Sequence, residues 1–150
     1  MQNFTGIDDY AGALGAHLGH SEWRTVTQEQ VDLFAEATDD HQWIHTDPER
    51  ARSGPFGGPI AHGFLTLSLL PALLREVYRV EGLSMVVNYG SNKVRFPRPV
   101  PVGCRVRAGA ELIELERSPQ GAQSTVRVTV EVEDSDKPAC VAEIVSLLRS

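Results

Sequence analysis

The segment DDHQWIHTDPERA, residues 39–51, places many titratable side chains beside apolar ones. Asp40 and His45 lie between two predicted helices, in the kind of connection where functional groups concentrate. A carboxylate and an imidazole can share one water molecule, and the neighbouring Trp43 and Ile44 would keep such a pair partly dry. These surroundings tune the pKa values of an acid and a base toward the working pH. The segment therefore favours Asp40 and His45 as an acid–base pair.

Two other interpretations of this segment stay open on spacing alone. Asp40 could be a solvated residue at the end of a helix, with His45 bonded to Asp47 in a turn. A metal site is a further alternative, since His41, His45 and Asp47 could supply three ligands. Zinc would need both histidines on one helical turn, whereas a new helix begins at Asp47-Pro48 and the residues before it look irregular. We therefore predict no metal and no cofactor.

Two short helices are predicted to flank the pair. Thr27 and Gln30 have the spacing of a capping box, and the apolar residues after them predict a helix over about 28–38. The Asp-Pro pair at 47–48 has the form of an N-cap followed by proline in the first turn, which predicts a helix over 48–52. The acid–base pair is then held in the connection between them.

A loop and a buried helix follow. The stretch SGPFGGPIAHG, residues 53–63, has the glycine and proline content of a loop that can bring its backbone close to a ligand. The next residues, 64–74, are apolar on nearly every face, which is typical of a buried helix. Pro71 is expected to kink this helix or to end it early.

The second half of the chain changes to a two-residue period. Apolar and polar residues alternate over 104–112 and 126–132, which predicts two antiparallel strands joined by a hairpin at 118–121. Two more strands are predicted over 83–88 and 139–148. The fold class is α+β, with an antiparallel sheet curled around the buried helix.

Composition narrows the classes of protein further. A chain of 150 residues with 41% hydrophobic residues is expected to form one domain over 1–150. Its net charge of -6 argues against a nucleic-acid partner. Cys104 and Cys140 fit buried thiols in a reducing compartment. The first twenty residues carry acidic side chains where a signal peptide would carry basic ones, and the apolar run 64–74 is too short to cross a membrane, so we expect a cytoplasmic protein without a membrane partner.

Two stretches resemble a known motif when they are taken together. FAEATDDHQWIHTDPERA (34–51) and GGPIAHGFLTLSLLPALL (57–74) are similar to the hydratase 2 motif of the MaoC-like, (R)-specific enoyl-CoA hydratases, F-A-x-x-T/S-G-D-x-N-P-x-H-x-D-x-x-x-A followed by I-x-H-G. The similarity extends into NYGSNKVRFPRPVPVG (88–103). Asp39 replaces the usual glycine, and Gln42-Trp43 replaces Asn-Pro, which affects the expected substrate preference more than the chemistry.

The resemblance implies a hotdog fold, in which a sheet wraps a long central helix, and a homodimer. It also implies that Asp40 and His45 hold the water that adds to C3 of a trans-2-enoyl thioester of coenzyme A, giving a (3R)-3-hydroxyacyl product. Negative charge then develops on the thioester oxygen. The backbone N–H of Gly63, at the start of the buried helix, is expected to stabilise that charge.

Other side chains are expected around the substrate. His62 is expected to bond to backbone and to fix the loop that aims the oxyanion donor. Ser68 matches a family position near the site, and Trp43 borders the pair. Tyr89 and Asn92 lie in the similar stretch NYGSN, where they line either the pocket or the dimer seam.

The only basic region of this acidic chain follows those residues. It contains Lys93, Arg95, Arg98, Arg105 and Arg107. Such side chains could bind the phosphates of coenzyme A through charge-assisted hydrogen bonds, and Lys93 and Arg95 are the preferred candidates. The alternative is that they are outward strand residues that balance nearby acids.

Two other functions are alternatives to hydration. A hotdog thioesterase would release a free thiol, but such enzymes lack an acid and a histidine at this spacing. A non-catalytic acyl-CoA-binding subunit is the third possibility, and the retention of both Asp40 and His45 argues against it.

Overall fold

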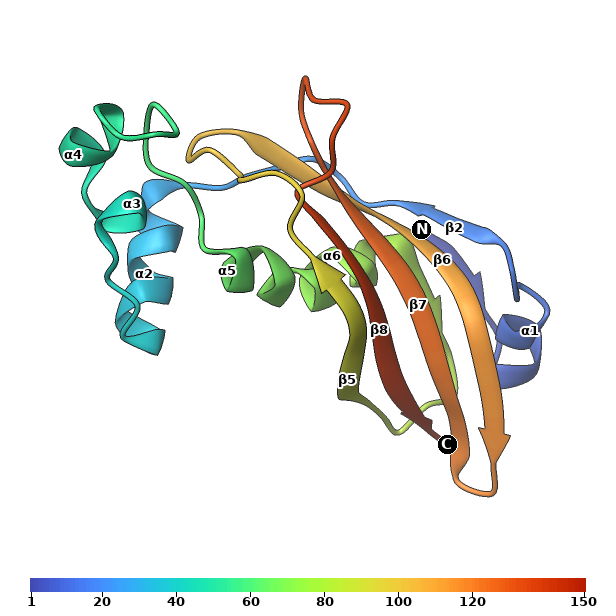
Figure 1. Cartoon of the computed structure of the whole chain (residues 1–150). Helices are drawn as coiled ribbons and strands as arrows, with labels where there is room; N and C mark the ends of the chain where they lie inside the picture. The colour runs from blue at the N-terminus through green and yellow to red at the C-terminus, as the bar shows by residue number, and fades with distance from the viewer.

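The computed structural model describes residues 1–150. Its main feature is a curved, six-stranded antiparallel sheet in the order β2-β6-β7-β8-β5, and β3 pairs with β6 along the same edge as β2 (Figure 1). The strands are His17–His20 (β2), Arg24–Thr25 (β3), Met85–Arg95 (β5), Arg105–Ser118 (β6), Gly121–Val132 (β7) and Cys140–Arg149 (β8). Gln2–Phe4 (β1) and Tyr78–Val80 (β4) form a separate parallel pair. The predicted α+β class is confirmed.

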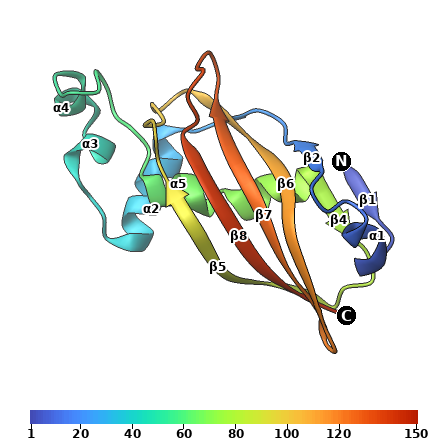
Figure 2. The same cartoon turned by 45° about the vertical axis from the view of Figure 1, so that its right-hand side comes forward.

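The central helix runs across one face of the sheet in two pieces (Figure 2). The pieces are Gly63–Ser68 (α5) and Leu70–Val77 (α6). Pro71 lies in the first turn of α6, where an N–H would have no intrahelical acceptor, so proline is tolerated there. The predicted interruption at Pro71 is confirmed, and the two pieces meet at Leu69.

The expectation that this helix is buried on every face is wrong on one side. Leu65, Leu70, Leu73 and Val77 are buried and belong to the core with the strands. Four other residues are exposed and share the opposite face of the helix: Phe64, Ser68, Pro71 and Arg75. We call these four residues the outer stripe. One sheet can cover only one side of a helix, so the sheet leaves the outer stripe uncovered.

The long hairpin of β6 and β7 forms the centre of the sheet. Both strands are longer than predicted and run to the turn at 118–121, where the hairpin was expected. A register shift between Leu112 and Glu114 moves the alternation of side chains by one residue. That shift explains why the two-residue period of the sequence predicted a strand ending at 112.

Strand β5 is an edge strand, because it pairs only with β8. Its sequence predicted a strand over 83–88, whereas the strand runs from Met85 to Arg95. Two register shifts interrupt it, between Asn88 and Gly90 and between Asn92 and Arg95. These irregularities break the alternation by which a strand is predicted.

Three helices form an arm at one end of the sheet (Figure 1). They are Gln28–Thr38 (α2), Trp43–Thr46 (α3) and Pro48–Arg52 (α4). The two predicted caps are confirmed: Thr27 accepts a hydrogen bond from the Gln30 N–H at 3.2 Å, and Asp47 accepts one from the Arg50 N–H at 3.0 Å. Helix α3 was expected to be irregular, because a single turn is too short to show helical periodicity.

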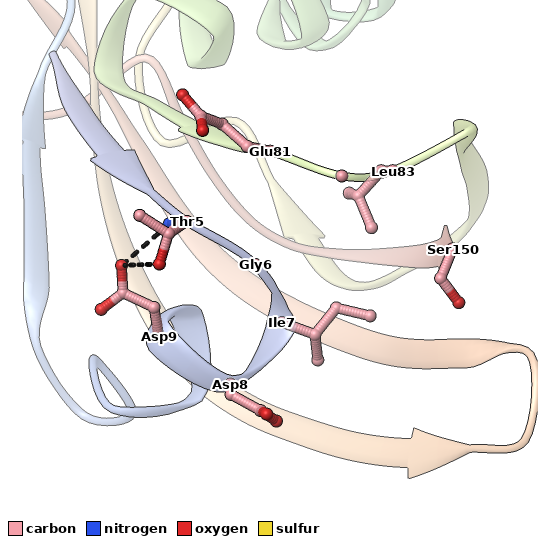
Figure 3. Close-up of a pocket in the computed structure, with 9 residues that line it drawn as sticks. Thr5, Gly6, Ile7, Asp8, Asp9, Glu81, Leu83 and Ser150 are labelled. Carbon is pink, nitrogen blue, oxygen red and sulfur yellow. Dashed lines mark hydrogen bonds between the residues drawn. The ribbon is translucent and has the colours of Figure 1, made fainter.

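The opposite end of the sheet carries Ile7–Ala11 (α1) and an open hollow of about 420 Å³ (Figure 3). Acidic and small residues line this hollow, and two of the acids are already engaged. Asp9 accepts from the backbone N–H of Thr5 at 2.9 Å, and Asp8 forms an ion pair with Arg117. No helix has the length and apolar character that a membrane crossing requires. The chemistry-bearing residues lie at the other end, on the arm.

Candidate active site

His45 is buried on α3, and one hydrogen bond fixes its chemistry. Its Nδ1 lies 2.6 Å from the backbone carbonyl oxygen of Ile60. A carbonyl can only accept, so Nδ1 carries the proton and Nε2 of the neutral ring keeps a free lone pair. The loop that holds Ile60 is itself fixed, since Ile60 N donates to Ile44 O at 3.0 Å and Ala61 N to Val100 O at 2.9 Å. His45 is therefore oriented to accept a proton at Nε2.

The surroundings of His45 favour its neutral form. Burial lowers the pKa of His45 below its ordinary value, because the charged ring would lose its hydration. The hydrogen bond to Ile60 opposes this effect, the neighbouring His62 lowers the pKa further, and the Asp40 carboxylate raises it. Burial is the largest of these effects, so His45 is available as a base in neutral solution.

Asp40 follows the end of α2. The helix ends at Thr38, and its C-cap residue Asp39 has φ 59° in the left-handed region. Glycine adopts this conformation most readily, and aspartate is one of the few other residues that tolerate it. That geometry accounts for Asp39 at a position where the resembling motif has glycine. Asp40 itself is exposed, and its carboxylate accepts only a long contact of 3.4 Å from the Gln42 N–H.

Asp40, His45 and His62 meet in space, with one ligand atom from each lying within 4.8 Å of the others. The rings of His45 and His62 stack, with centroids 3.9 Å apart and 24° between their planes. Nitrogen lone pairs lie in the ring plane, so those of stacked rings point side by side rather than at one ion. This arrangement does not fit a metal ion.

The ligand set of the predicted metal alternative does not assemble. His41 lies against two acids, 3.5 Å from Glu36 and 3.6 Å from Asp39, and is not among the groups that meet at His45. Asp47 caps α4 through its contact with the Arg50 N–H. The expectation that Asp47 is a capping residue is confirmed.

Gly63 follows His62 directly and is the first residue of α5. Its N–H therefore has no carbonyl acceptor within the helix. A side chain at Gly63 would be crowded, because a Cβ atom there would lie 3.1 Å from Cδ2 of Phe96. Phe96 lies after β5 and also contacts Phe64 edge to face at a centroid distance of 6.3 Å. The glycine thus leaves a free backbone donor beneath an aromatic ring.

The other predicted contact residues lie at different distances from this centre. Trp43 packs beneath the guanidinium of Arg50, 4.4 Å from its ring centroid, and against Gly54. Ser68 is in the outer stripe, and its hydroxyl donates to the Phe64 carbonyl at 2.6 Å. Tyr89 and Asn92 are exposed on the edge strand β5. None of these four side chains forms a hydrogen bond to His45 or stacks on its ring.

The basic region divides into paired and unpaired side chains. Arg105 binds Glu133, Arg107 binds Glu131 at 2.6 Å, and Lys93 lies 4.0 Å from Glu143. Arg105 and Arg107 therefore balance acids on the sheet, as the alternative interpretation held, and the phosphate role of Lys93 stays a prediction. Arg95 and Arg98 form no ion pair; Arg95 donates only to its neighbouring backbone carbonyl, that of Val94, at 2.7 Å.

The sequence pattern missed one residue that supports the site. Gln28 begins α2, and its side-chain amide donates to the His45 carbonyl at 2.8 Å and to Asp32 at 2.9 Å. It ties α3 to α2 from 17 positions away along the chain. No local spacing marks such a long-range contact, so only the fold reveals it.

Fold and site together define a class of protein. A curved antiparallel sheet around a central helix, with a carboxylate and an imidazole meeting beside the first residue of that helix, is the arrangement expected of a hotdog enzyme with an acid–base site. The MaoC-like domain family matches residues 9–135. The chain therefore belongs to the MaoC-like domain family.

Individual relatives agree with this assignment. The chain is 59% identical over 144 residues to 3-hydroxyacyl-thioester dehydratase Z of Mycobacterium tuberculosis, with 95% of each chain covered. It is 46% identical to nodulation protein N of Rhizobium leguminosarum, covering 95% of this chain and 91% of the relative. The solved structure of the (R)-hydratase from A. caviae involved in PHA biosynthesis superposes with a TM-score of 0.74 at 27% identity, covering 90% and 96% of the two chains. The expected hotdog fold is confirmed.

Proposed function

We propose that this chain catalyses the reversible addition of water to a trans-2-enoyl thioester of coenzyme A, giving the (3R)-3-hydroxyacyl thioester. The observation that best supports this proposal is that the Asp40 carboxylate lies close to His45, whose Nε2 is free to accept a proton. The name of the dehydratase relative supports the reaction class, and that of the A. caviae hydratase supports the (R) configuration.

The reaction begins with a water molecule held between Asp40 and His45. Nε2 of His45 takes one proton from this water as the water oxygen forms its bond to C3 of the enoyl group. The electron pair of the double bond moves toward the thioester, whose carbonyl oxygen gains negative charge. The Asp40–His45 pair then returns the proton to C2. One hydroxyl and one hydrogen have been added, and the reverse sequence is dehydration.

Gly63 supplies the donor for the developing charge. Its N–H lacks an intrahelical partner, and it follows His62, which contacts both His45 and Asp40. A fixed backbone donor at such a position is worth about 3 kcal/mol in other enzymes that stabilise an oxyanion. The absence of a side chain lets the thioester approach the backbone.

The phosphates of coenzyme A are assigned to Arg95 and Arg98. Of the basic side chains in the region 93–107, these two have no acidic partner. Both flank Phe96, which packs on Gly63. A free guanidinium is suited to bind a phosphate through charge-assisted hydrogen bonds.

The active form is proposed to be a homodimer. Strand β5 leaves one edge without a partner, and it exposes Met85, Val86, Val87 and Tyr89. Unpaired apolar edges of this kind are normally covered in a native protein. A second copy that pairs along β5 would cover these side chains and place new residues opposite the outer stripe.

Crotonyl-CoA provides the direct test. We expect loss of the enoyl-thioester absorbance, no release of free thiol, and a product that chiral chromatography identifies as the (3R) isomer. Release of thiol would instead identify a thioesterase. Tight binding of crotonyl-CoA without turnover would identify a binding subunit, and a (3S) product would overturn the assigned stereochemistry.

A further inference from the structure

The ring of His62 contacts both members of the proposed pair. It lies at the N-cap of α5 and is only 2% exposed. Its Nε2 lies 3.0 Å from the backbone carbonyl oxygen of Asp40, and its face stacks on the ring of His45. One buried side chain therefore links the segment that carries the carboxylate to the helix that carries the imidazole.

The two stacked rings have opposite tautomers. Nε2 of His62 faces a carbonyl, so the proton of its neutral ring is on Nε2. In His45 the proton is on Nδ1, which faces the carbonyl of Ile60. Nδ1 of His62 is buried and has no hydrogen-bond partner. Each ring thus directs its single N–H to a backbone acceptor and leaves its other nitrogen free.

Asp40 has little other support. Its side chain is exposed and accepts only the 3.4 Å contact from Gln42. Its place therefore depends on the backbone, where the bond from His62 holds the carbonyl of the same residue. Phe34 of α2 packs on the His62 ring from another side, with centroids 4.8 Å apart, and leaves that ring little room to turn.

We propose that His62 is a positioning residue: with its proton on Nε2, it holds the Asp40 backbone and the His45 ring in the arrangement in which they share one water. This inference rests on the proposed hydration function. His62 transfers no proton itself. Besides His62, the Asp40 carboxylate and the Ile60 carbonyl face the His45 ring, and the neutral amide of Gln28 bonds to the backbone carbonyl of His45.

The first test needs no turnover. Nitrogen-15 NMR of the imidazoles in the intact protein, at a pH where both rings are neutral, distinguishes an Nδ1–H ring from an Nε2–H ring. We expect His62 as the Nε2–H form and His45 as the Nδ1–H form. A His62 proton on Nδ1 would overturn the proposal, because the bond to Asp40 would then be absent.

The second test separates the hydrogen bond from the ring. His62→Phe keeps an aromatic ring on His45 but has no donor, so we expect kcat to fall roughly 10- to 100-fold while KM changes less than about threefold. His62→Gln restores an N–H donor and is expected to stay within about fivefold of the wild-type kcat. His41→Phe is the matched control at an exposed histidine and is expected to keep the wild-type rate.

The pH profile adds a second readout, which is clearest in His62→Phe because an aromatic ring still covers His45 in that variant. His62 lowers the pKa of His45, so the acid limb of kcat/KM should move to higher pH in both His62 variants. Wild-type kcat together with an unmoved acid limb in His62→Phe would overturn the positioning role. A wild-type chain that hydrates no enoyl-CoA would instead overturn the proposed function, and the NMR test would still decide the bonding of His62.

Discussion

At His45, a single hydrogen bond decides which nitrogen is free for chemistry. The Ile60 carbonyl accepts a hydrogen bond from Nδ1–H, so Nε2 keeps a free lone pair close to the Asp40 carboxylate. Asp40 differs, because it is exposed and weakly held. The imidazole is thus fixed by its own contacts, whereas the carboxylate is fixed through its backbone.

Removal of either functional group should abolish most of the activity without unfolding the chain. We expect Asp40→Asn and His45→Gln each to lower kcat by roughly 10²- to 10⁴-fold, the usual contribution of acid–base catalysis. Asp39→Asn is a matched control, since its carboxylate is exposed and asparagine also tolerates φ 59°. Steady-state hydration of crotonyl-CoA measures all three. Wild-type rates in the first two variants would contradict the assignment of Asp40 and His45 as the acid–base pair.

The pH dependence follows from the lowered pKa of His45. A histidine of an unfolded chain titrates near about 6.5, so the acid limb of kcat/KM should lie below that pH. Stability should change in the same window. As pH falls below about 6.5, His45 binds its proton in the unfolded chain before it does so in the folded chain. The free energy of unfolding therefore decreases as pH falls through this window. Kinetics and urea unfolding in parallel pH series test both effects, and an acid limb above 6.5 would contradict them.

Sequence spacing could predict the pair because Asp40 and His45 are only five positions apart and share one connection. It could not predict Gln28, which bonds to His45 across 17 positions, or the Ile60 carbonyl, which does so across 15. A backbone carbonyl has no side-chain signature at all. Contacts of this kind exist only once α2, α3 and the loop after α4 are packed.

At the scale of elements, Gly63 at the start of α5 packs against Phe96, the residue after β5. A Cβ atom at Gly63 would crowd the Phe96 ring at 3.1 Å. We expect Gly63→Ala to lower the free energy of unfolding by about 1–2 kcal/mol through overpacking. A double-mutant cycle with Phe96→Leu should show a favourable coupling, because the smaller side chain leaves room for the methyl group. Strict additivity would show that the two residues do not contact each other.

The β6–β7 hairpin offers a stricter test of backbone geometry. Gly121 has φ 136°, and a Cβ atom there would lie 1.9 Å from the Leu148 carbonyl oxygen. Gly121→Ala should therefore cost at least about 3 kcal/mol, since both the conformation and the neighbouring backbone exclude a side chain. Gly58→Ala is the control, because its added Cβ meets no atom within 4 Å. Equal midpoints of urea unfolding for the two variants would contradict this account.

Elements were predicted well where capping or alternation is regular. Both caps of the arm and the hairpin at 118–121 follow from short local patterns. The lengths of β5 and β6 did not follow, because register shifts interrupt their alternation. The outer stripe could not be predicted either, because an apolar helix sequence does not show how many faces of the helix a sheet will cover.

At the scale of the whole molecule, the edge of β5 and the outer stripe both expose aromatic side chains. The edge of β5 lacks a hydrogen-bonding partner, and Tyr89 on it is 67% exposed. Phe64, at the start of the outer stripe, is 69% exposed. Burying such side chains yields about 25 cal/mol for each Å² removed from water. A second copy on this side would remove the exposed edge and much of the exposed apolar surface together.

This geometry predicts the effect of a charge placed on the edge strand. Val86→Lys should shift the protein from two chains to one in light scattering after size exclusion, because the desolvated ammonium would oppose association. Hydration activity should fall with the fraction of dimer, so that raising the protein concentration partly restores the specific rate. Leu14→Lys is the matched control, an exposed leucine on the connection between α1 and β2, away from β5. A wild-type chain that is monomeric and fully active at micromolar concentration would show that one copy forms a complete site.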